Sequence, residues 1–166
     1  MSDITKSGVR ALVEAGDETA ILALFDEDPH RVQRFLKRLA CAPDAAHHAH
    51  TVACFRMLSR ERSAGMPEFF RETIRRSLWE MNEEGGNVAW SAPEIAAAVV
   101  AGAPERYGRF ASYLIMAALD EPTFHPSLLA AADLLAAADP ALVEEFLPQL
   151  ESVRFALGQR SCGGAK

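Results

Sequence analysis

The chain has 166 residues, of which 49% are hydrophobic and 24% charged. This is enough for one domain with a sizeable core and too little for two ordinary ones. No apolar run approaches the roughly 20 residues of a membrane span, and no secretory leader is expected. Cys41, Cys54 and Cys162 lack a CxxC spacing, which indicates free thiols and a cytoplasmic location. We expect one domain over residues 1–160 and a flexible tail over 161–166.

Alanine and leucine are abundant and β-branched residues are sparse, which favours an all-α fold. A first helix is expected near Asp3–Glu14, and four pairs of helices follow it. The first helices of these pairs are expected at Asp17–Glu27, Ala45–Arg62, Ala92–Ala101 and Ser127–Ala138. The second helices are expected to begin at Pro29, Pro67, Pro104 and Pro140, which are 38, 37 and 36 residues apart.

The proline-led segments share one pattern of apolar residues. Offsets of 3, 6, 7 and 10 from the proline carry mostly apolar side chains, which would lie on one face of a helix. Thr73 and Ser77 interrupt that face in the second segment. Proline suits the first turn of a helix, where its missing N–H would have no partner in any case. The pattern therefore predicts a helical hairpin used four times.

The two segments "DPHRVQRFLKRLA" and "DPALVEEFLPQL" carry a resemblance to known repeats. The period, the two helices per unit and the Asp-Pro pair resemble HEAT-like (armadillo/HEAT-type) repeat proteins, whereas the tetratricopeptide signature is absent. The resemblance implies a right-handed αα-superhelix, or solenoid, of about four hairpins plus an N-terminal helix. It also implies that the second helices line the concave face.

The stretch "LWEMNEEGGNVAWSAPE" (78–94) is expected to join the second and third hairpins. Ser91 and Glu94 have the spacing of a capping box, and Trp79 and Trp90 are expected to pack on each other or over the seam between repeats. Glu80, Glu83 and Glu84, with Asn82 and Asn87, either bind a cation or basic partner or form a solvated acidic helix end. The stretch resembles the pattern W-x-x-N-E-E-x-G-G-x-x-W-x-A-P-E of small bacterial HEAT-like proteins, for which no activity is implied.

His47, His50 and Cys54 fall on one stripe of the expected helix Ala45–Arg62, so a zinc site is conceivable there. Free cysteine also behaves as a small hydrophobe, and no known zinc spacing matches. We therefore expect neither a metal nor a cofactor. No GxSxG, HExxH or phosphate-binding glycine loop occurs, which favours a role without catalysis.

Charge is segregated along the chain, with a net charge of -5 over residues 1–28, +6 over 29–76 and -7 over 77–166. Offsets 2, 5 and 9 from the prolines form a second stripe that is rich in arginine, and arginine favours bidentate contacts with carboxylates. This predicts a protein-binding or scaffold module with an acidic partner and no membrane. The predicted partner-binding residues are Arg31, Arg34, Arg38, Arg71, Arg75, Arg76, Arg106, Arg109, Trp79, Glu83, Glu84 and Trp90.

Three other interpretations remain at this stage. The arginines would also suit a nucleic-acid backbone in a HEAT-like protein that processes bases, although a pI near 5.4 is unusual for a nucleic-acid binder. The His–Cys stripe would suit a metal-binding accessory protein. The arginines would also cover apolar surface and pair with glutamates of neighbouring repeats in a purely structural role.

Overall fold

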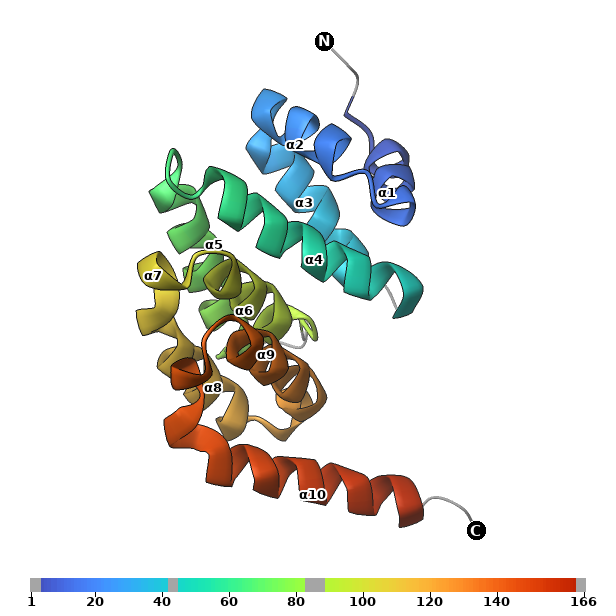
Figure 1. Ribbon diagram of the computed structural model, residues 1–166. Helices are drawn as coiled ribbons and strands as arrows, with labels where there is room; N and C mark the ends of the chain where they lie inside the picture. The colour runs from blue at the N-terminus through green and yellow to red at the C-terminus, as the bar shows by residue number, and fades with distance from the viewer. Residues whose placement is uncertain (1–3, 42–44, 83–88, 164–166) are drawn as a thin grey trace.

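The computed structural model describes residues 4–41, 45–82 and 89–163, and every regular element within these ranges is helical (Figure 1). The all-α prediction is confirmed for this part of the chain. No described helix is both long and apolar enough to cross a bilayer. The helices are α1 (Lys6–Ala15), α2 (Glu18–Glu27), α3 (Pro29–Ala40), α4 (Ala45–Arg62), α5 (Pro67–Met81), α6 (Ala92–Gly102), α7 (Pro104–Tyr107), α8 (Ala111–Asp120), α9 (His125–Ala138) and α10 (Leu147–Gly163).

Side-chain caps fix where the first three helices begin. Thr5, Asp17 and Asp28 each accept a hydrogen bond of 3.0 to 3.1 Å from the backbone N–H three residues later. These bonds satisfy donors that have no partner inside the helix. Helix α1 therefore starts at Lys6, slightly later than expected. It ends at Gly16, whose φ of 66° is in the left-handed region that glycine enters without strain.

Proline opens the second helix of the first three pairs as the spacing predicts, but only α3 and α5 continue without a break. After Pro104, α7 gives way to the 3-10 turn η1 (Gly108–Phe110) before α8 begins. After Pro140, the 3-10 turns η3 (Pro140–Leu142) and η4 (Glu144–Phe146) precede α10. Pro148 offers no N–H to the carbonyl of Glu144, and its ring would clash with that group. A continuous helix from Pro140 is thus prevented, and α10 begins at Leu147.

The repeated apolar positions form the core. The residues three positions after each proline are at most 4% exposed; they are Val32, Phe70, Tyr107 and Val143. Those at the other repeated offsets are buried as well, except the half-buried Phe110 and Leu147, which is 48% exposed where α10 restarts. Thr73 and Ser77 are buried like the apolar residues they replace.

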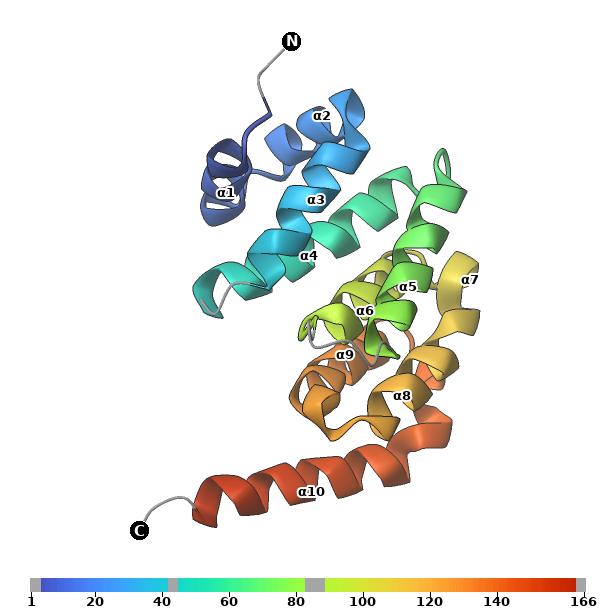
Figure 2. The same ribbon diagram turned by 180° about the vertical axis from the view of Figure 1, so that it is seen from behind.

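The helices form two layers. Helices α4, α6 and α9 lie side by side in one layer (Figure 1), and α3, α5 and α8 follow one another on the opposite side (Figure 2). Helix α6 occupies the centre and packs on α4, α5 and α9 through alanine and valine side chains that are almost all buried. Helix α1 packs on α2, α3 and α4 at one end, and α10 packs on α9 at the other. Helix α10 also extends three residues into the segment expected to be a tail.

Candidate functional site

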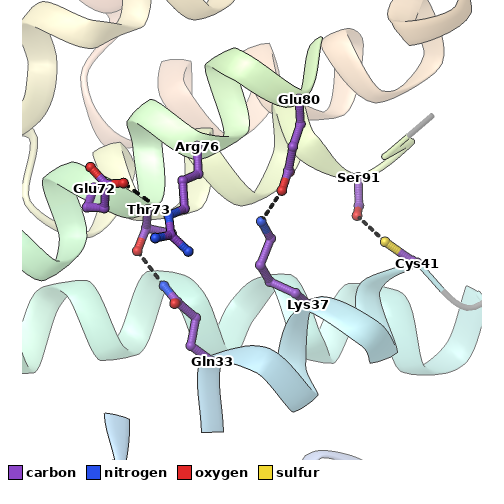
Figure 3. Close-up of polar contacts among 8 residues, drawn as sticks. All are labelled: Gln33, Lys37, Cys41, Glu72, Thr73, Arg76, Glu80 and Ser91. Carbon is purple, nitrogen blue, oxygen red and sulfur yellow. Dashed lines mark hydrogen bonds and ion pairs between the residues drawn. The ribbon is translucent and has the colours of Figure 1, made fainter. Parts of the chain in front are cut away.

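A row of polar side chains on α3 forms the seam between α3 and the helices α5 and α6 (Figure 3). Gln33, Lys37 and Cys41 are four residues apart, which places them one above another on a helix. Gln33 Nε2 donates a hydrogen bond to Thr73 Oγ1, and Cys41 Sγ lies 3.5 Å from Ser91 Oγ. Between these contacts, Lys37 Nζ lies 2.5 Å from Glu80 Oε1. We call Gln33, Lys37 and Cys41, with their partners, the polar seam.

A groove of about 1120 Å³ runs along the polar seam. Basic side chains from α1, α3 and α5 predominate in its lining, and they are Lys6, Arg31, Arg34, Lys37, Arg38 and Arg76. Asp28 and Glu80 add two carboxylates, and the exposed Trp90 and half-buried Ala89 add apolar surface at the end next to α6. We call this hollow the basic groove. Its excess of positive charge favours an anionic ligand.

The arginines of α3 flank the polar seam because of their positions around the helix. Arg34 and Arg38 follow Gln33 and Lys37 by one residue each, and so lie about 100° further round the helix. Both side chains are exposed, and the guanidinium of Arg34 lies 5.3 Å from the ring centre of Phe35. Lys37 and Arg38 also occupy the last turn of α3, where the helix dipole favours cations.

Arg76 supplies the positive charge on the α5 wall. Its Nε lies 3.0 Å from Glu72 Oε1, one turn earlier on the same helix, and its side chain is 68% exposed. An exposed pair of this kind contributes little to stability, because water screens it and both side chains lose freedom. An anion in the groove therefore competes with Glu72 for Arg76 at small cost.

The remaining arginines of the predicted stripe do not line the groove. Arg71 lies 2.6 Å from Glu68 on the same helix, and the guanidinium of Arg109 lies 5.1 Å from the ring centre of Phe110. Arg75 and Arg106 are exposed outside the groove. The groove thus brings together Arg31, Arg34, Arg38 and Arg76, and leaves the other four apart.

The two tryptophans do not pack as expected. Trp79 is 62% exposed and Trp90 59% exposed, and neither takes part in an aromatic pair within the described residues. Trp90 lines the basic groove, whereas Trp79 does not. Glu83 and Glu84 lie outside the described residues, so the acidic part of this stretch has no structural description.

The predicted capping box at the start of α6 is wrong, because both side chains have distant partners. The Ser91 side chain caps no backbone N–H and contacts Cys41 instead. The Glu94 carboxylate lies 2.7 Å from His48 Nε2, while His48 Nδ1 lies 2.9 Å from the carbonyl oxygen of Ala40. Burial lowers the pKa of His48, but its hydrogen bonds to Glu94 and Ala40 outweigh burial, so the pKa lies above the usual 6.5.

The His–Cys stripe is not assembled as a metal site in the described part of the chain. His47 pairs with Glu14 of α1 and accepts a hydrogen bond of 3.0 Å from Arg10 Nε. His50 is exposed, and Cys54 is buried, which raises the pKa of its thiol to about 11. Among the described residues, no group of three His, Cys, Asp or Glu side chains is placed to share an ion.

Sequence reasoning missed Lys6, Gln33 and Lys37 as groove residues, and it assigned Glu80 to binding a cation or basic partner and not to a pair with Lys37. The four-residue spacing of Gln33, Lys37 and Cys41 was readable, because three polar or small side chains at this interval mark one face of a helix. What the spacing does not show is which helix that face meets. Glu80 of α5 is 43 residues away from its partner Lys37.

No family model matches the chain, and comparison with curated proteins and with solved structures gives no significant match. No activity or partner of another protein therefore transfers to this chain. The function must therefore be inferred from the chemistry of the basic groove. Clustered guanidinium and ammonium groups bind carboxylates or phosphates, and the apolar surface at Trp90 binds an apolar group beside them.

Proposed function

We propose that the protein is a non-catalytic interaction or scaffold module that binds an acidic segment of another protein in the basic groove. The observation that carries this proposal is the convergence of basic side chains from α1, α3 and α5 on one hollow, with an exposed indole at its end. Clustered groups that act by charge, beside an exposed indole, suit binding of an anionic segment.

We further propose that the helix pairs form a right-handed superhelix of the HEAT-like type. The order α4, α6, α9 in one layer and α3, α5, α8 in the other supports this proposal, as do the buried residues at the repeated offsets. Stacked hairpins of this kind present a surface built from their second helices. The free thiols of Cys41 and Cys54 suit a reducing compartment such as the cytoplasm.

An acidic protein segment fits the basic groove better than a nucleic acid does. Asp28 and Glu80 lie among the basic side chains and would repel the evenly spaced phosphates of a nucleic acid. Trp90 and Ala89 offer apolar surface, which a peptide with mixed acidic and apolar residues covers. The net charge of -6 also disfavours a polyanion at long range.

The test uses two variants with equal changes in charge. Arg34→Glu with Arg38→Glu alters the groove, whereas Arg75→Glu with Arg106→Glu alters exposed arginines outside it. The probes are a fluorescein-labelled peptide of interspersed Glu, Asp, Phe and Leu residues and a labelled single-stranded DNA of the same length. Binding is measured by fluorescence anisotropy, and helicity by circular dichroism.

We expect the wild type to bind the peptide and the groove variant to bind it at least about tenfold more weakly, since two charge-assisted contacts are lost. The control variant should bind within about twofold of the wild type, because exposed charges outside the site act only through a screened field. Equal losses in both variants would refute the groove as the site. Binding of the DNA but not of the peptide would replace the proposed function with nucleic-acid binding.

A further inference from the structure

An ion pair within the chain occupies the middle of the basic groove. Lys37 Nζ lies 2.5 Å from Glu80 Oε1, and the two side chains are only 25% and 26% exposed. The second carboxylate oxygen, Glu80 Oε2, is buried and has no hydrogen-bond partner among the described residues. A carboxylate oxygen that has lost water without gaining a partner is poorly compensated. Glu80 is therefore the member of this pair that a better-placed anion displaces.

Arginines beside the pair offer the contacts that Glu80 lacks. Arg34 and Arg38 line the same groove, and in the described part of the chain neither forms an ion pair. A carboxylate that enters from solvent is free to contact Lys37 and a guanidinium together. Hydrogen bonds between ionised groups are about twice as strong as neutral ones. The groove thus favours an external carboxylate over that of Glu80.

Trp90 marks a second, apolar position further along the groove. Its side chain is 59% exposed and lines both the basic groove and an adjoining hollow of about 440 Å³. Cys41 and Ser91 line both hollows too, so the two adjoin at this point. Exposed indoles beside a pocket are common anchors for partners, because they bury a large apolar area with little loss of side-chain freedom.

The distance between the two positions follows from α3. Lys37 and Cys41 are one turn apart, which is about 6 Å along the helix axis. Cys41 contacts Ser91, the residue next to Trp90, and lines both hollows with it, so Cys41 lies near the apolar position. An extended peptide advances about 3.3 Å per residue, so two residues cover this separation.

We infer that the groove recognises an extended segment with an acidic residue two positions from an aromatic or aliphatic one. The acidic side chain takes the place of Glu80 on Lys37, and the apolar side chain packs on Trp90. Glu80 acts as an internal competitor, and segments without a carboxylate at the matching position do not displace it. This inference rests on the proposed function, whose partner class it narrows.

The experiment measures the affinity of short labelled peptides by fluorescence anisotropy. One pair of peptides contains Glu-Ser-Phe or the reverse order Phe-Ser-Glu, because the structure does not favour either chain direction. Matched peptides carry Gln in place of Glu, or Ala in place of Phe. The protein variants are Glu80→Gln and Trp90→Ala. Their controls are Glu68→Gln, which removes the same charge from α5 outside the groove, and Trp79→Ala, which removes the other exposed indole.

We expect Glu80→Gln to bind the Glu–Phe peptide about fivefold more tightly than the wild type. The peptide then no longer has to displace the Glu80 carboxylate from Lys37. Trp90→Ala should bind it about tenfold more weakly and should bind the Phe→Ala peptide as the wild type does. Both control variants should stay within about twofold of the wild type.

An unchanged or weaker affinity of Glu80→Gln would overturn the inference, because Glu80 would then support the groove wall and not compete. If the wild type bound the Phe and Ala peptides with equal affinity, the inferred role of Trp90 would be wrong. Either result leaves the proposed function in place as long as the acidic peptides bind. Failure of every acidic peptide to bind both the wild type and Glu80→Gln would refute the proposed function itself.

Discussion

Helices α4 and α6 approach each other closely at Gly102, and the substitution Gly102→Ala tests that approach. A Cβ atom at this position would stand 2.4 Å from the carbonyl oxygen of Arg56, 2.7 Å from Ser59 Cβ and 3.0 Å from the backbone nitrogen of Arg60. These atoms belong to the backbone or are fixed to it, so no side-chain rotation relieves the contact. The end of α6 must therefore move away from α4 by about 1 Å to restore van der Waals distances.

The expected loss of stability has two parts. Overpacking that forces the backbone to shift costs about 1 to 3 kcal/mol. The same movement strains the 2.7 Å hydrogen bond from Ser59 Oγ to the carbonyl oxygen of Val99. A hydrogen bond of this type is worth about 1 kcal/mol. We expect Gly102→Ala to lower the free energy of unfolding by about 3 kcal/mol, and hence Tm by about 6 to 12 °C for a chain of this size.

Gly158 provides the matched control. It lies within α10, and a Cβ there would have no atom within 4 Å. Gly158→Ala should stabilise the protein by up to about 1 kcal/mol, because alanine loses less backbone entropy in a helix. Thermal and urea unfolding, followed by far-ultraviolet circular dichroism, measures both variants. A Tm for Gly102→Ala equal to or above that of the wild type, with Gly158→Ala behaving as expected, would refute the close approach of α4 and α6.

Further predictions concern individual side chains. The raised pKa of His48 stabilises the fold below pH 6.5, and this contribution is lost as the pH rises through the folded-state value. The difference in urea midpoint between wild type and His48→Gln should therefore shrink between pH 6 and pH 8. Gln33→Leu or Thr73→Val alone should destabilise by about 1 kcal/mol, whereas the double variant should come close to wild type, as a double-mutant cycle would show. In a Cys162→Ser variant, maleimide should label exposed Cys41 in the native state and buried Cys54 only after unfolding. Rapid labelling of both thiols in the native state would contradict the burial of Cys54.

Much of the helical framework was predictable because local rules decide it. The expected helix Ala45–Arg62 has the bounds of α4, and prolines begin α3, α5 and α7 as the spacing indicated. The break before α10 was readable as well. Pro148 prevents a continuous α-helix from Glu144 through Leu147. The apolar residues at regular offsets from Pro140 nevertheless suggested such a helix.

The arginine stripe was only partly predictable. Residues at the same offset from their prolines point to the same side only if the helices are continuous and similarly oriented. The 3-10 turn after α7 breaks this equivalence at Arg109, which does not continue the row of Arg34 and Arg38, and Arg106 of α7 lies outside the groove as well. The capping box failed for a different reason. Ser91 and Glu94 are bound by residues 50 and 46 positions away, and a local pattern contains no information on such partners.

Thr73 explains why the groove lies between α3 and α5. Apolar neighbours such as α6 and α9 pack through alanine, valine and leucine, and separating them would expose buried apolar surface at a large free-energy cost. At the polar seam, Gln33 and Lys37 instead meet a hydroxyl and the carboxylate of Glu80. Polar groups exchange one hydrogen-bond partner for another at a small net cost. The interruption of the apolar pattern at Thr73 thus marks the interface at which the proposed partner would replace contacts within the chain.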